Sequence, residues 1–213
     1  MTERKLLSGE AEGQAYTKAW GDEEAGERLQ IYAEMLVSEN QKQNLISKPT
    51  EEQLWLRHFA DSAQLLEHVP RETYTQGAPG PWLDLGSGPG LPGLIIAILR
   101  PEIQVILVES RVRRVEFLNR CTEALGLRNC TILGQRLERI EPFESWVISA
   151  RAFAPLEKLL RLSAPFSTKA TRFLLPKGRS AAHELSEIKA SIRNMFHVER
   201  SLTDLEAGII VSK

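Results

Sequence analysis

The segment WLDLGSGPGLPG, residues 82–93, concentrates the residues whose types and spacing suggest chemistry. Four glycines follow a short apolar run there: Gly86, Gly88, Gly90 and Gly93. An apolar run that ends in such a turn is typical of the first strand of a parallel sheet, where the backbone can approach a nucleotide-like ligand. A tight turn without a ligand would not need so many glycines.

Two overlapping glycine patterns predict two different ligands. The segment from Gly88 to Gly93 fits G-x-G-x-x-G, the dinucleotide fingerprint. The segment from Asp84 to Gly90 fits D-x-G-x-G-x-G, the first motif of methyltransferases that use S-adenosylmethionine (AdoMet). A carboxylate at Asp84 would repel a pyrophosphate, whereas it would attract the sulfonium and ammonium groups of AdoMet. The pattern therefore favours AdoMet.

Glu109 ends the next apolar run, QVILVE. A carboxylate at that position accepts hydrogen bonds from ribose hydroxyls in NAD enzymes and in methyltransferases alike, so it indicates an adenosine ligand without naming it. The alternative is an NAD(P)-linked oxidoreductase. The sequence shows neither a separate substrate domain nor a candidate acid–base pair, and both observations argue against this alternative. A third hypothesis is a module that binds AdoMet or RNA without turnover. The residues predicted to bind the cofactor from this pattern are Asp84, Gly86, Gly88, Gly90 and Glu109.

Basic residues follow several predicted strands at the edge where the ligand would lie. Arg136 and Arg151 could hold a nucleic-acid phosphate or the O6 atom of a guanine. Lys177, in the segment LLPKG, is predicted to contact phosphate, with a simply solvated lysine as the alternative. The run from Arg111 to Arg114 could extend this basic rim, although such a run is usually a solvated surface.

Another group of polar residues lies on one predicted helix. Arg57, His58 and Asp61 are spaced i, i+1 and i+4, so they share a helical face. Their ordinary interpretation is a surface pair between Arg57 and Asp61 beside a half-buried His58. The functional interpretation is that Arg57 and His58 help to meet RNA or the edge of the cofactor. Asn44 is interpreted as a helix-end residue.

The elements that must position these residues follow from apolar periodicity. A helix is predicted from Asp22, and a second one from Thr50, which would cap it together with Gln53. From residue 82 on, strands and helices alternate, which predicts an α/β fold with a mostly parallel sheet and an antiparallel hairpin at one edge. The predicted strands are 82–85, 104–109, 131–134, 146–150, 172–176, 196–201 and 208–212, and the predicted helices between them are 91–100, 111–125, 155–163 and 181–195.

The bulk composition sets limits on the class of protein. The chain has 213 residues, 42% hydrophobic content and a net charge of −1, which predicts a globular protein without a general nucleic-acid coat. Residues 1–12 are expected to fray, and residues 71–81 to form a linker between a helical extension (1–70) and the main domain (71–213). Cys121 and Cys130 are too few for a disulfide framework or a four-cysteine zinc site, and we expect no metal. Neither a signal peptide nor a membrane span is recognisable, so we expect a cytoplasmic protein.

Beyond these patterns, a set of motifs resembles one known family. DLGSGPGLPG is followed by RPE, LVES, GQRLE, SARAFAPL and PKG, and is preceded by QNLIS and RHFADS. In this order and register, over about residues 28–178, they resemble the RsmG (GidB) family of 16S rRNA guanine-N7 methyltransferases. The resemblance implies a class I methyltransferase fold, a seven-stranded Rossmann-like sheet with helices on both faces and a small N-terminal helical extension. It also implies AdoMet as the cofactor and 16S rRNA as the substrate, either free or within the small ribosomal subunit, for a protein we expect to be a monomer.

The resemblance also implies roles for individual residues. Gly86 and Leu91 would contact AdoMet from the loop, and Leu137 and Glu138 would flank its adenine, while Arg151 would close the site. Two positions depart from the family pattern: Trp146 replaces an aspartate, and Ala150 stands where a serine commonly precedes the arginine.

The implied reaction needs little acid–base chemistry. N7 of guanine has a free lone pair and no proton, so its attack on a sulfonium methyl group requires no general base, and catalysis can rest on in-line positioning. We therefore expect Arg151, Lys177 and His58 to act by positioning the reactants, with Arg57, Arg136 and Lys177 binding the RNA. His58 is the leading candidate if a base is required after all.

Overall fold

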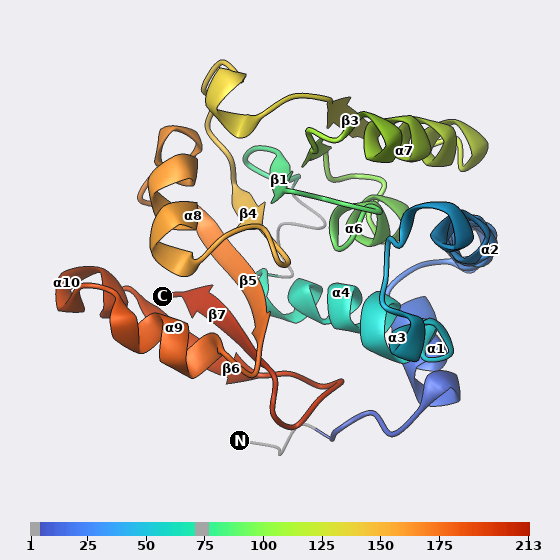
Figure 1. Cartoon of the computed structure of the whole chain (residues 1–213), viewed down its shortest axis with the longest axis horizontal. Helices are drawn as coiled ribbons and strands as arrows, with labels where there is room; N and C mark the ends of the chain where they lie inside the picture. The colour runs from blue at the N-terminus through green and yellow to red at the C-terminus, as the bar shows by residue number, and fades with distance from the viewer. Residues whose placement is uncertain (1–4, 71–76) are drawn as a thin grey trace.

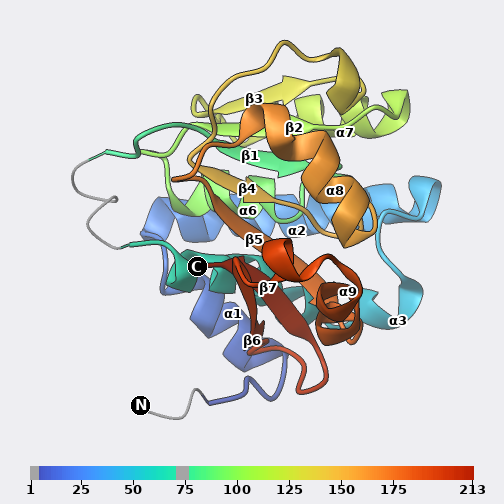
Figure 2. The same ribbon diagram turned by 90° about the vertical axis from the view of Figure 1, so that its left-hand side faces the viewer.

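The computed structural model describes residues 5–70 and 77–213, which form a seven-stranded sheet with the strand order β3-β2-β1-β4-β5-β7-β6. Figure 2 shows this order running from β3 at one edge to β6 at the other. The strands are β1 Trp82–Leu85, β2 Val105–Val108, β3 Cys130–Leu133, β4 Val147–Ser149, β5 Arg172–Gly178, β6 Phe196–Arg200 and β7 Gly208–Ser212. The predicted fold class is confirmed.

The last strand of the chain, β7, lies between β5 and β6 in the sheet. β1 to β5 are parallel, whereas β7 is antiparallel to both β5 and β6. β7 therefore lies inside the sheet and β6 forms the edge. As a result, the loop that joins β6 to β7 lies beside the carboxyl end of β5, near the predicted site.

Alternating side chains divide the core between the two faces of the sheet. Trp82 and Val105 pack with the helices α2, α6 and α7 on one face, and Leu83 and Leu85 pack with α8 and α9 on the other (Figure 1). Strands buried on both faces are typical of a parallel sheet covered by helices. The helices that follow β1 are α6 Gly93–Leu99, α7 Val112–Ala124, η3 Leu137–Arg139, α8 Leu156–Ser163, η4 Ala164–Phe166, α9 Ala181–Glu187 and α10 Ala190–Arg193.

The N-terminal helices share a core with α6 and so with the sheet. The side-chain carboxylate of Glu10 accepts hydrogen bonds from the backbone N–H groups of Trp55 and Leu56, at 3.0 and 2.8 Å. This contact holds the first helix against the segment that contributes polar residues to the site. These helices are α1 Glu10–Lys18, α2 Glu23–Gln43, α3 Lys48–Glu51, the wide π-helical turn η1 Trp55–Ala60, α4 Asp61–Ala63 and the 3-10 helix η2 Gln64–His68. The division at residue 70 stays a prediction.

Several local predictions were wrong. Thr50 does not cap a helix with Gln53, because α3 has already begun at Lys48 and Ser47 precedes it. Residues 10–12 do not fray, since α1 begins at Glu10. The predicted helix 181–195 is broken at Ile188 into α9 and α10. Of the predicted linker, residues 71–76 lie outside the described part.

The two cysteines differ in burial, and within the described residues the helices are too short or too polar to span a membrane. Cys121 is buried, whereas Cys130 is only partly buried at the start of the edge strand β3. Within residues 5–70 and 77–213, no helix combines the length and the apolar character that a bilayer crossing requires.

Candidate functional site

A cavity of about 360 Å³ opens at the carboxyl ends of β1 and β2, beside the glycine-rich turn. Gly86 and Glu109 line it from these two strand ends, and Leu137 and Glu138 line it from η3. Phe153 contributes from the segment after β4. Four residues that were predicted to bind the cofactor are thus brought together around one cavity, which we call the upper cavity.

Glu109 is the centre of the polar contacts in the upper cavity. One of its carboxylate oxygens accepts a hydrogen bond from the backbone N–H of Gly88 at 3.1 Å. The other accepts from the N–H groups of Ser110 and Arg111 at 2.7 and 2.9 Å. The Arg114 guanidinium lies 3.6 Å from the first oxygen. The first oxygen, which among the described residues accepts only from Gly88, has a second lone pair, so Glu109 can still accept from a ribose hydroxyl.

The glycine turn approaches the segment after β4 very closely. Gly86 has a φ of 66°, and a Cβ atom there would lie 2.6 Å from the ring of Phe153. Only glycine fits this combination of left-handed backbone and close approach. Ala152, next to that ring, also has a positive φ of 56°, which is uncommon outside glycine and clusters at functional sites.

Asp84 does not line the upper cavity, and its contact with a cofactor stays a prediction. Its side chain is completely buried, accepting hydrogen bonds from the Ser149 hydroxyl at 2.7 Å and from the Gly93 N–H at 3.3 Å. Burial raises the pKa of Asp84 to about 6, against the opposing effect of these hydrogen bonds. Asp84 therefore ties β1 to β4 and to the start of α6, and supports the turn from beneath.

The other loop residues predicted to bind the cofactor also shape the turn. Gly88 uses its N–H on Glu109. Gly90 packs so closely on α6 that a Cβ atom would lie 2.3 Å from Leu94, and the Leu91 side chain is buried in the core. None of these three residues is among those that line the upper cavity, and their contact with a cofactor stays a prediction.

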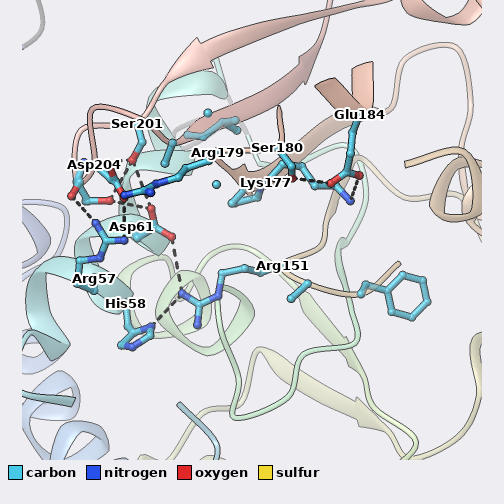
Figure 3. Close-up of a pocket in the computed structure, with 18 of the residues that line it drawn as sticks. Arg57, His58, Asp61, Arg151, Lys177, Arg179, Ser180, Glu184, Ser201 and Asp204 are labelled. Atoms are coloured by element: carbon cyan, nitrogen blue, oxygen red, sulfur yellow. Dashed lines mark hydrogen bonds and ion pairs between the residues drawn. The ribbon is translucent and has the colours of Figure 1, made fainter. Parts of the chain in front are cut away.

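A larger cavity of about 1040 Å³ lies beside the first one, between the N-terminal helices and the β6–β7 loop. We call it the lower cavity. Arg57, His58, Arg151 and Lys177 line it (Figure 3). The two cavities share the segment 152–154, so they meet at the carboxyl end of β4.

Arg57 binds the β6–β7 loop rather than Asp61. Its guanidinium donates to the backbone carbonyl of Thr203 at 3.0 Å and to the carboxylate of Asp204 at 2.9 Å. Asp61 instead accepts from the Thr203 hydroxyl at 2.9 Å and from the Gln64 amide at 2.8 Å. The expected Arg57–Asp61 pair was wrong, because the loop offers closer partners from a distant part of the sequence.

His58 and Arg151 contact each other across the wall of the lower cavity. The Arg151 guanidinium lies 3.1 Å from Nδ1 of His58 and 3.7 Å from the carboxylate of Asp61 (Figure 3). On its other side, His58 Nε2 lies 2.8 Å from the Thr50 hydroxyl. Burial, together with the positive charges of Arg151 and Arg57, lowers the pKa of His58 to about 3, so the imidazole is neutral at ordinary pH.

Lys177 is not a solvated lysine. Its side chain is only 6% exposed, and its ammonium donates to the Ala154 carbonyl at 2.7 Å and pairs with Glu184 at 2.9 Å. Glu184 also accepts from the backbone N–H of Leu156. The Lys177–Glu184 pair therefore holds both ends of the segment from Ala154 to Leu156, next to the residues that line both cavities. The binding of RNA by Lys177 stays a prediction, and these two contacts of its ammonium are internal.

The remaining predicted residues lie where their position in the sequence suggested. Arg136 is exposed at the rim of the upper cavity, next to Arg111 and Arg114. Asn44 ends α2 with a left-handed φ of 50°, which supports its interpretation as a helix-end residue. Among the described residues, no group of histidine, cysteine and acidic side chains could hold a metal ion.

Sequence reasoning missed Thr203, Asp204 and Glu184. They lie 146, 147 and 7 positions from their basic partners Arg57 and Lys177. No local motif marks the first two, because their partners come from the opposite end of the chain. Phe153 was visible within the motif SARAFAPL, but only its approach to Gly86 reveals its place between the cavities.

Comparison with protein families gives a match over most of the chain. Residues 25–208 match the GidB family model, described as rRNA small subunit methyltransferase G. A relative from Erythrobacter litoralis (strain HTCC2594), named ribosomal RNA small subunit methyltransferase G, is 51% identical over 98% of both chains. One of the same name from Cereibacter sphaeroides (strain ATCC 17025 / ATH 2.4.3) is 39% identical, covering 87% of this chain and 88% of its own.

Solved structures resemble the chain in fold. MtNAS in complex with S-adenosylmethionine has a TM-score of 0.53 at 18% identity, over 86% of this chain and 75% of that one. A putative S-adenosyl-L-methionine-dependent methyltransferase from Methanococcus maripaludis has a TM-score of 0.51 at 12% identity, over 85% and 91%. At such low identity, these similarities concern the arrangement of the sheet and helices.

Proposed function

We infer the reaction from one premise: the chain belongs to the GidB family, the rRNA small subunit methyltransferase G proteins. It is thus an AdoMet-dependent methyltransferase, which excludes the NAD(P)-linked oxidoreductase as its identity. We propose that its target is N7 of a guanine in 16S rRNA, in the loop near the decoding site. It would act as a monomer, with residues 1–70 as a helical extension of the domain 71–213.

The observation that supports this proposal best is the junction of two cavities at one short segment. The upper cavity has a buried carboxylate, Glu109, which suits the hydroxyls of the AdoMet ribose. The turn at Gly86 has no side chain, so AdoMet can approach its backbone closely. The lower cavity has room for a base and is lined by Arg57 and Arg151. A methyl donor in one and a base in the other would meet across residues 152–154.

AdoMet supplies an electrophilic methyl group when it is bound. The task of this chain is then to exclude water and to align a nitrogen lone pair with that group. Arg151 can donate to O6 of a guanine, the atom next to N7 on the same edge of the base. Arg136 and the run from Arg111 to Arg114 can hold flanking phosphates at the rim.

His58 is poorly suited to act as a general base. Its Nδ1 faces a guanidinium, which is always a donor, and its pKa is lowered to about 3. An exocyclic amine must lose a proton during methylation, whereas N7 has none to lose. The lack of an available base at this position therefore supports N7 rather than an amine.

The decisive experiment is to map methylated nucleotides in 16S rRNA from cells with and without this protein. We expect one 7-methylguanosine to disappear in its absence and to return on incubation of the unmodified small subunit with the protein and AdoMet. Parallel reactions on protein-free 16S rRNA decide which form is the substrate. Methylation of an exocyclic amine, or of another rRNA, would overturn the proposal.

A further inference from the structure

A chain of three hydrogen-bonded groups leads from the N-terminal helices to Arg151. The Thr50 hydroxyl donates to the backbone carbonyl of Ser47 at 2.9 Å, and His58 Nε2 lies 2.8 Å from the same hydroxyl. His58 Nδ1 lies 3.1 Å from the Arg151 guanidinium. None of the sequence motifs singled out Thr50 for this position, which it reaches because α3 places it beside η1.

Donor and acceptor rules define the direction of each bond. A guanidinium can only donate, so Nδ1 of His58 must accept and cannot hold a proton. In a neutral imidazole the proton then lies on Nε2, which must donate. The Thr50 hydroxyl oxygen accepts the hydrogen bond from Nε2–H of His58, and the Thr50 hydroxyl hydrogen is donated to the Ser47 carbonyl. All three groups are consistent with one tautomer of His58.

Other contacts cannot replace this arrangement. Among the described residues, Arg151 has one other polar partner, Asp61, at 3.7 Å, which allows charge attraction but is too long for a directed hydrogen bond. His58 is only 7% exposed, so water has little access to its ring. If Nδ1 were protonated, it would face a guanidinium donor, and Arg151 would have to turn away.

We propose that Thr50 is a positioning residue, which sets the tautomer of His58 so that the imidazole holds Arg151 at the junction of the two cavities. In this role, Thr50 and His58 act through Arg151 and not on a reacting atom. The inference rests on the proposed role of Arg151 in aligning the base. It also explains why a histidine stands in a site whose reaction needs no base.

Two substitutions at Thr50 form a matched pair. Thr50→Val removes the hydroxyl at nearly constant shape, and Thr50→Ser retains it. We expect Thr50→Val to lower kcat/KM for methylation of the small subunit about 3- to 10-fold, the effect of one lost hydrogen bond, and Thr50→Ser to match the wild type. Nitrogen-15 NMR of His58 should show Nε2 protonated in the wild type and in Thr50→Ser, and a mixture of tautomers in Thr50→Val.

Substitutions at His58 separate positioning from base catalysis. The amide oxygen of His58→Asn can accept from Arg151 as Nδ1 does, whereas His58→Ala offers no acceptor. We expect His58→Asn to be several-fold more active than His58→Ala. In the His58→Ala background, Thr50→Val should cause no further loss, because it acts through the missing ring.

Several results would overturn the proposal. These are equal activity of Thr50→Val and Thr50→Ser, an added loss from Thr50→Val in His58→Ala, or a wild-type His58 protonated at Nδ1. If Thr50→Val melts early, the tautomer in the wild type and the comparison of His58→Asn with His58→Ala still decide the question. Failure of the wild type to form 7-methylguanosine would instead refute the proposed function, whatever the tautomer.

Discussion

Glu109 combines a structural and a binding task in one carboxylate. It accepts hydrogen bonds from the N–H groups of Gly88, Ser110 and Arg111, so it joins the glycine turn to the start of α7. Glu109 also lines the upper cavity, where we propose that a ribose lies. A change at this residue should therefore affect both the turn and the affinity for the cofactor.

We expect Glu109→Gln to weaken AdoMet binding by about 1.5–3 kcal/mol, the range for hydrogen bonds to a charged group. The amide NH2 group would also face backbone N–H donors, so the melting temperature should fall as well. Isothermal titration calorimetry and a thermal melt measure the two effects. Glu116→Gln, on the exposed surface of α7, is the control and should change neither. Unchanged affinity in a folded Glu109→Gln protein would show that the ribose lies elsewhere.

The pKa of His58 makes the stability of the fold depend on pH. Burial, with the charges of Arg151 and Arg57, lowers this pKa from 6.5 to about 3, so between these values the unfolded chain binds a proton that the folded chain does not. The free energy of unfolding should therefore fall as the pH decreases from about 6.5 toward 3, by at most about 1.4 kcal/mol per pH unit. Urea unfolding of the wild type and of His58→Asn at several pH values measures this slope.

Asp84 contributes the opposite slope in part of that window. Its pKa is raised from 3.8 to about 6, so the folded chain retains a proton that the unfolded chain has lost, and this contribution decreases as the pH rises toward 6. Asp84 is present in both proteins, so the difference between their slopes isolates His58. Parallel slopes for the wild type and His58→Asn would mean that the pKa of His58 is the same in the folded and the unfolded chain.

At the scale of elements, the site depends on the segment between β4 and α8. Phe153 packs on Gly86 on the side of the upper cavity, and Lys177 at the end of β5 holds the carbonyl of Ala154 on the other. Glu184 in α9 then joins Lys177 to the N-terminus of α8. Three elements thus determine the place of a segment that lines both cavities.

We expect Lys177→Met to act through this segment rather than through phosphate. Its loss leaves Glu184 without its ammonium partner, so the protein should lose about 1–3 kcal/mol of stability and AdoMet affinity should fall several-fold. The salt dependence of RNA binding should stay the same. Lys169→Met, in an exposed position before β5, is the control and should be neutral. A salt slope reduced by about one phosphate contact, with unchanged AdoMet affinity, would restore Lys177 as an RNA-binding residue.

At the scale of the whole molecule, a net charge of −1 conceals an uneven distribution of basic groups. Exposed arginines line the upper cavity at the carboxyl edge of the sheet: Arg111 and Arg136. Such a rim can attract a polyanion without making the whole protein basic, because salt screens charges beyond about 10 Å. The RNA should therefore approach this edge.

We expect Arg136→Gln to weaken RNA binding and to reduce the salt slope by about one phosphate contact, without a change in melting temperature. Filter binding of 16S rRNA at several salt concentrations measures the slope. Arg139→Gln, three positions away in the same turn but absent from the lining of the upper cavity, is the matched control. Equal effects of the two substitutions would indicate a general attraction instead of a specific contact.

The sequence by itself determined the order of strands and helices and the type of the main loop. Apolar runs separated by amphipathic segments specify a covered parallel sheet, and the glycines from Gly86 on mark the turn that a left-handed backbone requires. Because parallel strands share one carboxyl edge, the placement of Glu109, Arg136 and Arg151 at the same edge followed from the strand order alone.

Only the tertiary structure decided which polar groups pair. Arg57 could bind Asp61, four positions away, yet it binds Thr203 and Asp204 at the far end of the chain, since β7 inserts into the sheet and brings their loop to η1. Burial likewise gave Asp84 and Lys177 internal partners that the sequence had not indicated, because a charged group enclosed by the fold must find such partners. The spacing of residues along the sequence cannot show which distant segments bury a charged side chain. For that reason, only the folded structure reveals the partner of each charged group.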